Sequence, residues 1–335
     1  MTIPQLSARQ AARPFLIATA LLAFTAGAPL RAQDYPNHAV TFVVGFPPGS
    51  SSDIVARNLG ARLAERLGKP FVIENKPGAG SIIAAQTVAR AAPDGHTILI
   101  APSGTIAINP ALYKNLPYDP MKDFVFVAHT ASFPLILVVN PKSPIKSVKD
   151  LIRVAKERPD QLTFASSGAG TSIHLAGELF KAEAGIKMTH IPYKGPALAV
   201  TDIIAGHVDM IFSDPGTVVE HVKEGTLRAL AVTSKERFPV LPDVPTMDES
   251  GLPGFDAGSW HMIVAPKDTP EAIVTKLRNE FNTIIGMPEV RQQLLNVGLV
   301  GVSNSPDSAE LRKFAESETV RWTKIVKQSG LAGTE

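Results

Sequence analysis

Short apolar runs alternate along the chain with stretches in which apolar residues recur every three or four positions. The run VTFVVGF, residues 40–46, has the pattern of a buried strand, and apolar residues then recur every four positions from Val55 to Leu67. This spacing predicts a helix that ends at Gly68. The segments FVIEN, IIAAQTVARAA and HTILIAP continue the order strand, helix, strand. The order predicts a parallel sheet with right-handed crossovers.

A second set of the same kind begins with QLTFASSGAGTS at residue 161. It leads into the predicted helix IHLAGELFKAEAG and then into the predicted strands MTHIPY, DMIFSD and LRALAVT. The loops FPPGSSSD and ASSGAGTS are alike in position and chemistry, although few residues match. The sequence therefore predicts two similar α/β lobes without a sequence repeat.

Two apolar strands bounded by proline or glycine look like passages between these lobes, at residues 134–144 and 257–270. If the chain leaves the first lobe at one passage and returns at the other, the middle of the chain forms an inserted lobe. We expect lobe 1 to comprise residues 33–137 and 259–335, and lobe 2 to comprise residues 138–258. The last helices would complete lobe 1, with their charged faces in solvent.

The first 32 residues have the pattern of a secretory signal peptide. Arg9 and Arg13 precede the apolar stretch FLIATALLAFTAGA. Cleavage after Ala32 would leave a mature chain of about 303 residues, while cleavage after the small residues 26–28 would put Pro29 behind the cut. An uncleaved anchor is the alternative, but the apolar run is shorter than the roughly 20 residues that span a bilayer. We expect an exported, periplasmic protein.

Charge and composition exclude several classes of protein. The chain has 33 basic and 31 acidic residues, and removal of the signal peptide takes away Arg9, Arg13 and Arg31 but no acidic residue. The mature protein is thus nearly neutral, and no basic tract suggests nucleic acid or an anionic membrane as a partner. The absence of cysteine excludes disulfides, thiol nucleophiles and thiolate metal sites.

The loop that follows the first predicted strand has the chemistry of an anion site. In an α/β sheet such a loop delivers the N-terminus of the next helix, where the first amides lack partners and carry a partial positive charge. The small residues Gly49 to Ser52 let a carboxylate reach these amides and add hydroxyl donors, and Pro47 and Pro48 stiffen the approach. The same residue types also cap helices, so helix capping is the alternative.

Three such loops occur, at Gly49 to Asp53, Pro77 to Ser81 and Ser166 to Ser172. Ligands of open α/β sheets bind beyond the carboxyl ends of the strands, so the loops could converge on one crevice. Their equivalent positions favour an anion pocket over three separate caps. We expect Asp53 to cap its own helix or to orient the loop, since an unpaired carboxylate would repel the ligand.

These segments, together with AAPDGHTILIA, NLPYDPMKDF, HIPYKGPALAVTDIIAGHVDM and LRALAVTSKERFPVLPDVPTMDESGLPGF, resemble the Bug-type periplasmic receptors of tripartite tricarboxylate transporters. The resemblance runs from about Tyr35 to the C-terminus. It implies an α/β, two-lobed periplasmic-binding-protein fold (type II, Venus-flytrap) with parallel-rich sheets. It also implies a receptor that closes over a small carboxylate and presents it to membrane transporter subunits.

The resemblance further implies that two loops of lobe 1 hold the carboxylate through backbone amides while residues of lobe 2 close the cleft. Family members often carry glycine where Ser50 and Ser81 stand here, so the ligand could differ from that of relatives. The candidate ligand-binding residues are Phe46, Gly49, Ser50, Ser51, Ser52, Asp53, Gly78, Ala79, Gly80, Ser81, Ser103, Ser167, Gly168, Gly170, Thr171, Ser172, His174, Tyr193 and Asp214.

Several single residues admit more than one interpretation. His174 could line the cleft or form a surface pair with Glu178, and two possible ligands without a third are weak evidence for a metal. Tyr193 could contact a ligand or pack at a strand end, and Asp214 could bind a ligand amine, hold waters or cap the next helix. We expect Trp260 to pack at the hinge, and stacking on the ligand is the alternative. Lys194 could pair with a distal carboxylate or lie in solvent.

The sequence thus predicts a monomeric solute receptor without a catalytic step, cofactor or metal. No G-x-S-x-G elbow announces a hydrolase, and the glycine loops lack the third glycine of the dinucleotide fingerprint. The alternatives are a sensing module for a membrane signalling protein and an exported enzyme that acts on a carboxylate. Di- and tricarboxylates, aromatic carboxylates and amino acids are all possible ligands.

Overall fold

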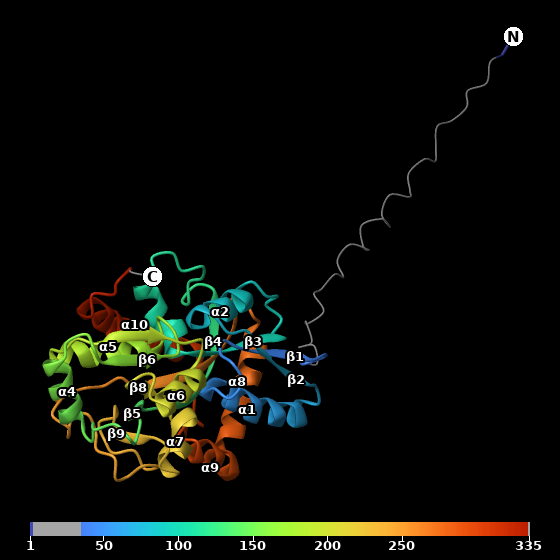
Figure 1. Cartoon of the computed structure of the whole chain (residues 1–335). Helices are drawn as coiled ribbons and strands as arrows, with labels where there is room; N and C mark the ends of the chain where they lie inside the picture. The colour runs from blue at the N-terminus through green and yellow to red at the C-terminus, as the bar shows by residue number, and fades with distance from the viewer. Residues whose placement is uncertain (3–34, 334–335) are drawn as a thin grey trace. The chain divides into compact units, whose positions relative to one another are not determined.

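The computed structural model describes residues 1–2 and 35–333. The chain divides into two units, Met1–Tyr35 and Pro36–Glu335, and the helices and strands among the described residues belong to the second (Figure 1). The predicted signal peptide, residues 1–32, falls almost wholly outside the described residues, so its cleavage stays a prediction. Within the described residues no helix is both long enough and apolar enough to cross a membrane.

The first sheet contains six strands. Strands β1, β2 and β3 pair in parallel, as the alternating pattern predicted, with β1 in the middle. The remaining pairs are antiparallel, because β10 returns from a distant part of the chain and lies between β3 and β4. In spatial order the strands are β11 (Val300–Gly301), β4 (Phe124–Phe133), β10 (Ser259–Pro266), β3 (Thr97–Pro102), β1 (Val40–Val44) and β2 (Phe71–Asn75).

The second sheet contains five strands and has the same mixed character. Strands β7, β6 and β8 pair in parallel, whereas β5 pairs antiparallel with β8 and β9. The predicted strands MTHIPY, DMIFSD and LRALAVT are confirmed as β7, β8 and β9. In spatial order the strands are β7 (Thr189–Pro192), β6 (Thr163–Ser166), β8 (Met210–Ser213), β5 (Ile136–Val139) and β9 (Arg228–Val232).

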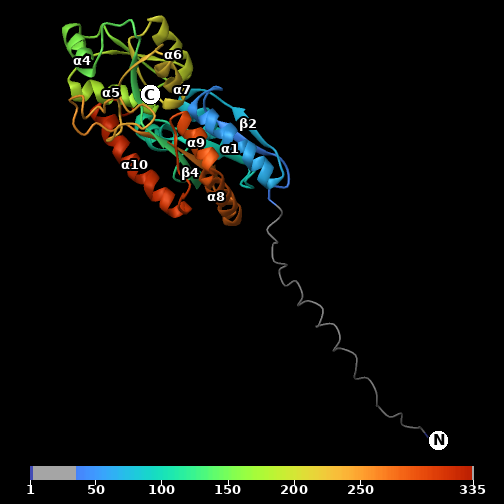
Figure 2. The same ribbon diagram turned by 90° about the horizontal axis from the view of Figure 1, so that it is seen from below.

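Helices cover both sheets, and we call each sheet with its helices a lobe. In lobe 2 the helices are α4 (Val148–Glu157), α5 (Ser172–Ala184), α6 (Pro196–Ala205) and α7 (Pro215–Lys223). In lobe 1 they are α1 (Ser51–Leu67), α2 (Ile82–Ala89), α3 (Asn109–Leu112), α8 (Glu271–Gly286), α9 (Pro288–Asn296) and α10 (Ser308–Gln328), with the short turns η1 (Ala79–Ser81) and η2 (Gly104–Ile108). Figure 2 shows α4 to α7 in one group and α1, α8, α9 and α10 in the other.

The core of lobe 1 is built from the central strands. All eight residues of β10 are buried, because strands flank it on both sides and helices cover both faces. Helix α1 buries Val55, Leu59 and Leu63 against this sheet and ends at Gly68, as the spacing of four predicted. The long strand β4, which the sequence pattern did not reveal, pairs with β10 at the centre of the sheet.

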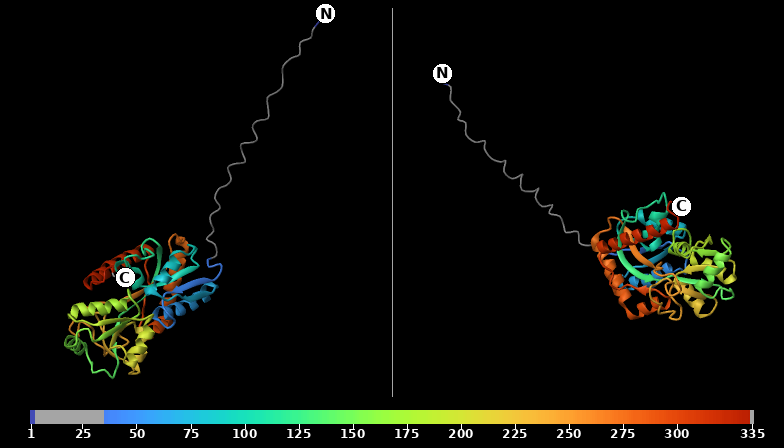
Figure 3. Two further views of the ribbon diagram at one scale, coloured as in Figure 1. Left: turned by 45° about the horizontal axis from the view of Figure 1, so that its top comes forward. Right: turned by 90° about the vertical axis from the view of Figure 1, so that its left-hand side faces the viewer.

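The chain crosses between the sheets twice. It passes from β4 to β5 through Pro134 and Leu135, and it returns between β9 and β10. Strand β5 begins at Ile136, two residues before the predicted lobe 2 limit at 138. Figure 3 shows the result: the first and last parts of the folded chain lie together, and the middle part forms the other group. The lobe limits themselves stay a prediction.

The topology also positions the loops. Helices α1 and α2 follow the carboxyl ends of β1 and β2, while α5, α6 and α7 follow the carboxyl ends of β6, β7 and β8. Because these strands run in parallel within each sheet, the N-termini of the helices gather at one edge of each lobe. The two edges supply the residues of one pocket.

Candidate functional site

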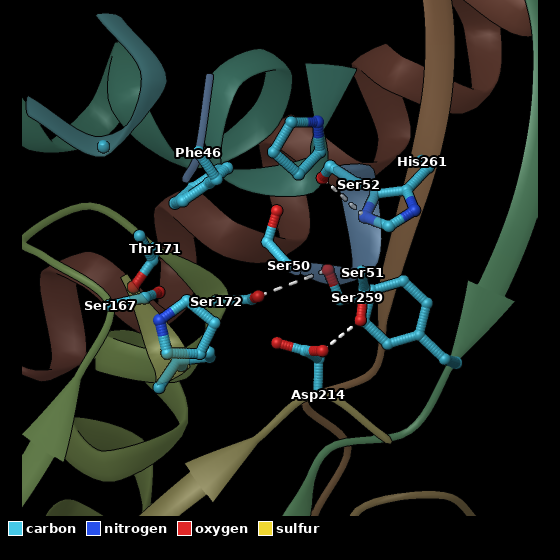
Figure 4. A pocket seen from close by; sticks show the side chains of 16 residues that line it. Phe46, Ser50, Ser51, Ser52, Ser167, Thr171, Ser172, Asp214, Ser259 and His261 are labelled. Atoms are coloured by element: carbon cyan, nitrogen blue, oxygen red, sulfur yellow. Dashed lines mark hydrogen bonds between the residues drawn. The ribbon is translucent and has the colours of Figure 1, made fainter. Parts of the chain in front are cut away.

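The pocket lies between the two lobes and takes its lining from both (Figure 4). The space inside has a volume of about 40 Å³, which is room for only a few water molecules. A larger ligand could therefore enter only if the lobes move apart. The lining residues are Phe46, Ser50, Ser51, Ser52, Gly80, Pro102, Gly104, Phe133, Ser167, Thr171, Ser172, Ile173, Pro196, Asp214, Ser259 and His261.

The N-terminus of α1 forms the lobe 1 side of the pocket. Ser50 is its N-cap and accepts a hydrogen bond from the amide of Asp53, and the next amide, of Ile54, bonds to the Ser50 carbonyl. The amides of Ser51 and Ser52 make no hydrogen bond to any described residue. These two amides are the free donors of the first turn, where the partial positive charge of the helix lies.

Helix α5 presents the same arrangement from lobe 2. Thr171 is its N-cap and accepts from the amide of His174, and the Leu175 amide bonds to the Thr171 carbonyl. The amides of Ser172 and Ile173 make no hydrogen bond to any of the residues that the structure describes. Two helices from different lobes thus each leave two N-terminal amides unpartnered at residues that line the pocket.

Three serine hydroxyls of the lining are already engaged within the protein. Ser51 donates to Asp214, and the Ser52 hydroxyl lies 3.0 Å from Nε2 of His261. The Ser172 hydroxyl donates to Ser259 at 3.2 Å. The sequence had suggested that these serines add hydroxyl donors for the ligand. The structure instead uses them to join elements, which leaves backbone amides as the main donors.

Asp53 supports the α1 loop, as its sequence position predicted. Its carboxylate accepts from the Gly49 amide at 3.0 Å, from Arg57 at 2.9 Å and from Asn75 at 2.9 Å. Burial alone would raise the pKa of Asp53, but the hydrogen bonds from Arg57, Gly49 and Asn75 outweigh it and hold the pKa below its usual range. Asp53 is 3% exposed and does not line the pocket, so it acts on the loop rather than on a ligand.

The loops of the two lobes touch closely beside the pocket. A Cβ added at Gly80 would lie 2.7 Å from the carbonyl oxygen of Ala169, and one at Gly104 would lie 2.8 Å from that of Gly170. A Cβ at Gly195 would lie 3.0 Å from Pro47. Only glycine permits such contacts at these positions, so the structure shows the lobes closed on each other.

Asp214 and His261 are the titratable groups in the lining. Burial raises the pKa of the Asp214 carboxyl above its usual range, although the hydroxyls of Ser51 and Thr217 favour its ionised form. Burial, together with nearby His129, lowers the pKa of His261 to about 3, so its imidazole is neutral near pH 7. Within residues 35–333 the lining includes no Lys or Arg.

The structure brings nine of the predicted site residues together in the lining. They come from all three predicted loops and from the end of β8. These residues are Phe46, Ser50, Ser51, Ser52, Gly80, Ser167, Thr171, Ser172 and Asp214.

Ten predicted residues are not among the described lining residues, and the side chain of one of them, Ala79, lies outside the described part of the chain. Most of them shape the loops: Gly49 donates its amide to Asp53, Ser103 bonds to Ser259 at 2.8 Å, and Ser81 adopts the left-handed φ of 75° at the start of α2. The loop glycines contact the opposite lobe or turn the chain. The ten residues are Gly49, Asp53, Gly78, Ala79, Ser81, Ser103, Gly168, Gly170, His174 and Tyr193.

His174 and Tyr193 have other partners in the structure. His174 stacks on His190 with ring centroids 4.1 Å apart, and burial with the nearby charges of His190 and Lys181 lowers its pKa to about 3. The Tyr193 hydroxyl donates to Asp202 at 2.6 Å, and its pKa rises to about 12 through burial and that hydrogen bond. Packing at the strand end, the alternative for Tyr193, fits this placement.

The pair His174 and Glu178 is buried, not a surface pair. Nε2 of His174 lies 3.9 Å from Oε1 of Glu178, and Glu178 forms an ion pair with Lys181 at 2.8 Å. Among the described residues no group of three or more His, Cys, Asp or Glu side chains is placed to hold a metal ion.

Seven lining residues were not predicted from the sequence, and most come from strands of lobe 1 that cross behind the loops. Ser259 and His261 lie on one face of β10, while Trp260 faces away and donates to Glu318 at 2.8 Å. Ser259 pairs with Phe133, and His261 pairs with Pro102. Two polar residues at alternate positions of an otherwise apolar strand were the available signal. The seven are Pro102, Gly104, Phe133, Ile173, Pro196, Ser259 and His261.

Two mixed α/β lobes with a pocket between loop-borne helix N-termini define a two-lobed binding-protein fold, and the comparison with solved structures confirms it. The periplasmic binding protein BugD is 34% identical and superposes with a TM-score of 0.85 over 89% of this chain and 99% of its own. The family model described as tripartite tricarboxylate transporter family receptor matches residues 55–331. The chain therefore belongs to this receptor family, as its motifs suggested.

Other relatives extend the similarity across the chain. Protein BugT of Bordetella pertussis is 37% identical over 315 residues, which is 94% of this chain and 95% of its own length. Rpa4515 of R. palustris, solved with adipate, is 37% identical with a TM-score of 0.85 over 89% of this chain and 99% of its own. MatC of Rhodopseudomonas palustris, solved with bound malate, is 34% identical and superposes with a TM-score of 0.82 over 87% of this chain and 100% of its own.

Proposed function

We propose that this protein is a receptor that binds a small carboxylate between its lobes and does not convert it. One observation carries the proposal: the unpartnered amides of Ser51 and Ser52 from lobe 1 and of Ser172 and Ile173 from lobe 2 belong to one pocket. Paired helix N-termini favour an anion, since each offers directed N–H donors and a partial positive charge. The solved relatives with adipate and malate support a carboxylate as that anion.

Closure of the lobes is the proposed mechanism. The amides from the two lobes can satisfy one ligand together only when the loops approach each other as they do here, so binding supplies the free energy of closure. The small free volume agrees with a ligand that enters an open form and is then enclosed. The candidate residues of the site remain those of the lining, with Asp53, Gly49 and Ser103 as supports.

The setting of this receptor is also part of the proposal. We infer export to the periplasm after cleavage near Ala32, with residues 33–137 and 259–335 as lobe 1 and 138–258 as lobe 2. The family to which the chain belongs supports delivery of the ligand to tripartite tricarboxylate membrane subunits by a monomeric receptor. A module that reports the same ligand to a signalling protein would need the same pocket.

Titration calorimetry on the purified mature protein tests the function. The panel contains mono-, di- and tricarboxylates, aromatic acids and amino acids, and each hit is recovered and checked for chemical change. We expect selective binding, a rise in Tm that follows ligand concentration, and a ligand recovered intact. Conversion of a hit would identify an enzyme, and failure of every carboxylate to bind would overturn the receptor proposal.

A further inference from the structure

Asp214 holds an unusual position at the end of β8, before α7. It is the N-cap residue of α7, and the backbone amides of Asp214 and Thr217 lie near enough to its carboxylate to favour the ionised form. One oxygen, Oδ1, accepts from the Thr217 hydroxyl at 3.0 Å and from Ser51 of the opposite lobe. The side chain is 6% exposed. Helix capping, one of the interpretations of this residue, therefore does not account for its contact with Ser51 of the opposite lobe.

The second carboxylate oxygen of Asp214 points into the pocket. Figure 4 shows Oδ1 joined to Ser51 and the other oxygen directed away from that bond, into the space between the lobes. Within residues 35–333, the two side-chain donors to Asp214, Ser51 and Thr217, both reach Oδ1, and no ion pair involves this carboxylate. The lining offers no Lys or Arg, and His261 is neutral.

A buried carboxylate without a cationic partner is costly, because burial removes its hydration. A ligand that carried only negative charge would add repulsion to that cost. A ligand with a positive group would supply the missing partner and gain a charge-assisted hydrogen bond. Most of the other lining residues beside the amides are apolar or already hydrogen bonded, and the apolar ones include Phe46, Phe133 and Pro196.

Ser51 places the anion site and the acidic oxygen close together. Its backbone amide is one of the free donors of α1, while its hydroxyl holds the Asp214 carboxylate. The two binding features therefore lie within the span of one residue. We therefore expect the carboxylate and the ammonium group of the ligand to be only a few bonds apart.

We propose that the ligand is a carboxylate that also carries an ammonium group, and that Asp214 is the residue that selects it. This inference rests on the proposed receptor function. In the complex, the carboxylate accepts from the amides of Ser51 and Ser52, and the ammonium donates to Oδ2 of Asp214. The free space of about 40 Å³ must widen to admit such a molecule, and the lining, within the described residues, holds no second carboxylate for another positive charge.

The test compares ligand pairs that differ by the amine alone, namely L-aspartate with succinate and L-alanine with propionate. Malate serves as the analogue that bears a hydroxyl in place of the amine. Calorimetric affinities are measured for the wild-type protein, for Asp214→Asn and for Asp53→Asn. The Asn side chain at 214 can still accept from Ser51 and Thr217. Asp53→Asn is the matched control, since it removes a buried carboxylate of the neighbouring loop that does not line the pocket.

We expect the wild-type protein to bind the amine member of at least one pair about tenfold or more tightly than its partner, which corresponds to about 1.4 kcal/mol. In Asp214→Asn this preference falls to less than about threefold, while Asp53→Asn affects both members of a pair alike. If the wild-type protein bound malate as tightly as L-aspartate, the inference would be contradicted.

The remaining outcomes separate the two proposals. If Asp214→Asn weakens both members of a pair equally, the residue is only a contact between the lobes and the inference is overturned. Tight binding of succinate or propionate without any amine preference overturns the inference and leaves the receptor function intact. If no carboxylate binds at all, both proposals fall.

Discussion

At the scale of single residues, two buried aspartates of the same region have opposite environments. Asp53 receives three hydrogen bonds from its own lobe, which hold its pKa low. Asp214 receives two hydroxyl donors on one oxygen and has a raised pKa because it is buried without a cation. The first carboxylate shapes a loop, and the second faces the space where a ligand would lie.

Asp53→Asn tests the structural role of the first aspartate. Because the pKa of Asp53 is lowered, its ionised carboxylate stabilises the folded protein at pH values above the ordinary pKa of 3.8. This contribution is lost as the pH falls through the folded-state pKa. At pH 7 we expect the substitution to lower the free energy of unfolding by about 1.5–3 kcal/mol. The difference from wild type should shrink below about pH 4.

Urea unfolding at several pH values provides the measurement, with the exposed Asp243→Asn as a control that stays within about 0.5 kcal/mol of wild type. If Asp53→Asn lowered the free energy of unfolding by the same amount at pH 3 and pH 7, the effect would not depend on the ionised carboxylate. That result would contradict the structural role assigned to Asp53.

Ser81→Gly tests a strained position in the second loop of lobe 1. Ser81 adopts a φ of 75°, and its hydroxyl is buried without a hydrogen bond among the described residues. The left-handed conformation costs an L-residue about 1–2 kcal/mol, and glycine avoids that cost while losing part of the gain to its own chain entropy. We expect a stabilisation of about 1 kcal/mol in urea unfolding.

Ser81→Ala is the matched control, since it removes the hydroxyl and keeps the Cβ. Ser81→Ala should raise the free energy of unfolding by less than Ser81→Gly does. If alanine stabilised the protein as much as glycine did, the unpartnered hydroxyl and not the backbone would be the source of the strain.

At the scale of elements, the helices and most strands followed from local pattern. The period of four from Val55 to Leu67 marked α1, and Gly68 marked its end. Strand β4 was missed because it lies in a stretch whose alternation is broken by His129 and Thr130. The residues of η2 gave no helical period, since a π-turn follows a different spacing.

The loops before the helices carry the element-scale prediction, which compares Gly80→Ala with Gly49→Ala. Both glycines have positive φ, so each substitution strains the backbone to a similar degree. Only the Cβ at Gly80 would meet the opposite lobe, 2.7 Å from the Ala169 carbonyl, whereas nothing lies within 4 Å of a Cβ at Gly49. We therefore expect similar losses of stability but a selective loss of affinity in Gly80→Ala.

Calorimetry with the best ligand of the panel measures the effect. Gly80→Ala should weaken binding about tenfold or more, and Gly49→Ala by less than about threefold, because only the former blocks closure. Equal affinities of the two variants would show that contact between these loops is not needed for binding.

At the scale of the whole molecule, the pocket depends on pairings that no local pattern specifies. Motifs predicted the loops from both lobes, including Ser51, Ser172 and Asp214. Phe133, Ser259 and His261 were missed because they meet through antiparallel pairing of β10 with strands far away in sequence. The serine hydroxyls were assigned to the ligand for the same reason: their protein partners lie far away in sequence, 209 residues for Ser52 and His261 and 163 residues for Ser51 and Asp214.

The most direct test of the central claim is a crystal structure of the mature protein with the best ligand of the carboxylate panel. We predict a closed form in which a carboxylate accepts hydrogen bonds of about 2.7–3.2 Å from the amides of Ser51 or Ser52, and the same ligand contacts the N-terminus of α5. A ligand held by side-chain cations, bound to one lobe alone or bound outside the pocket would contradict this account of the protein.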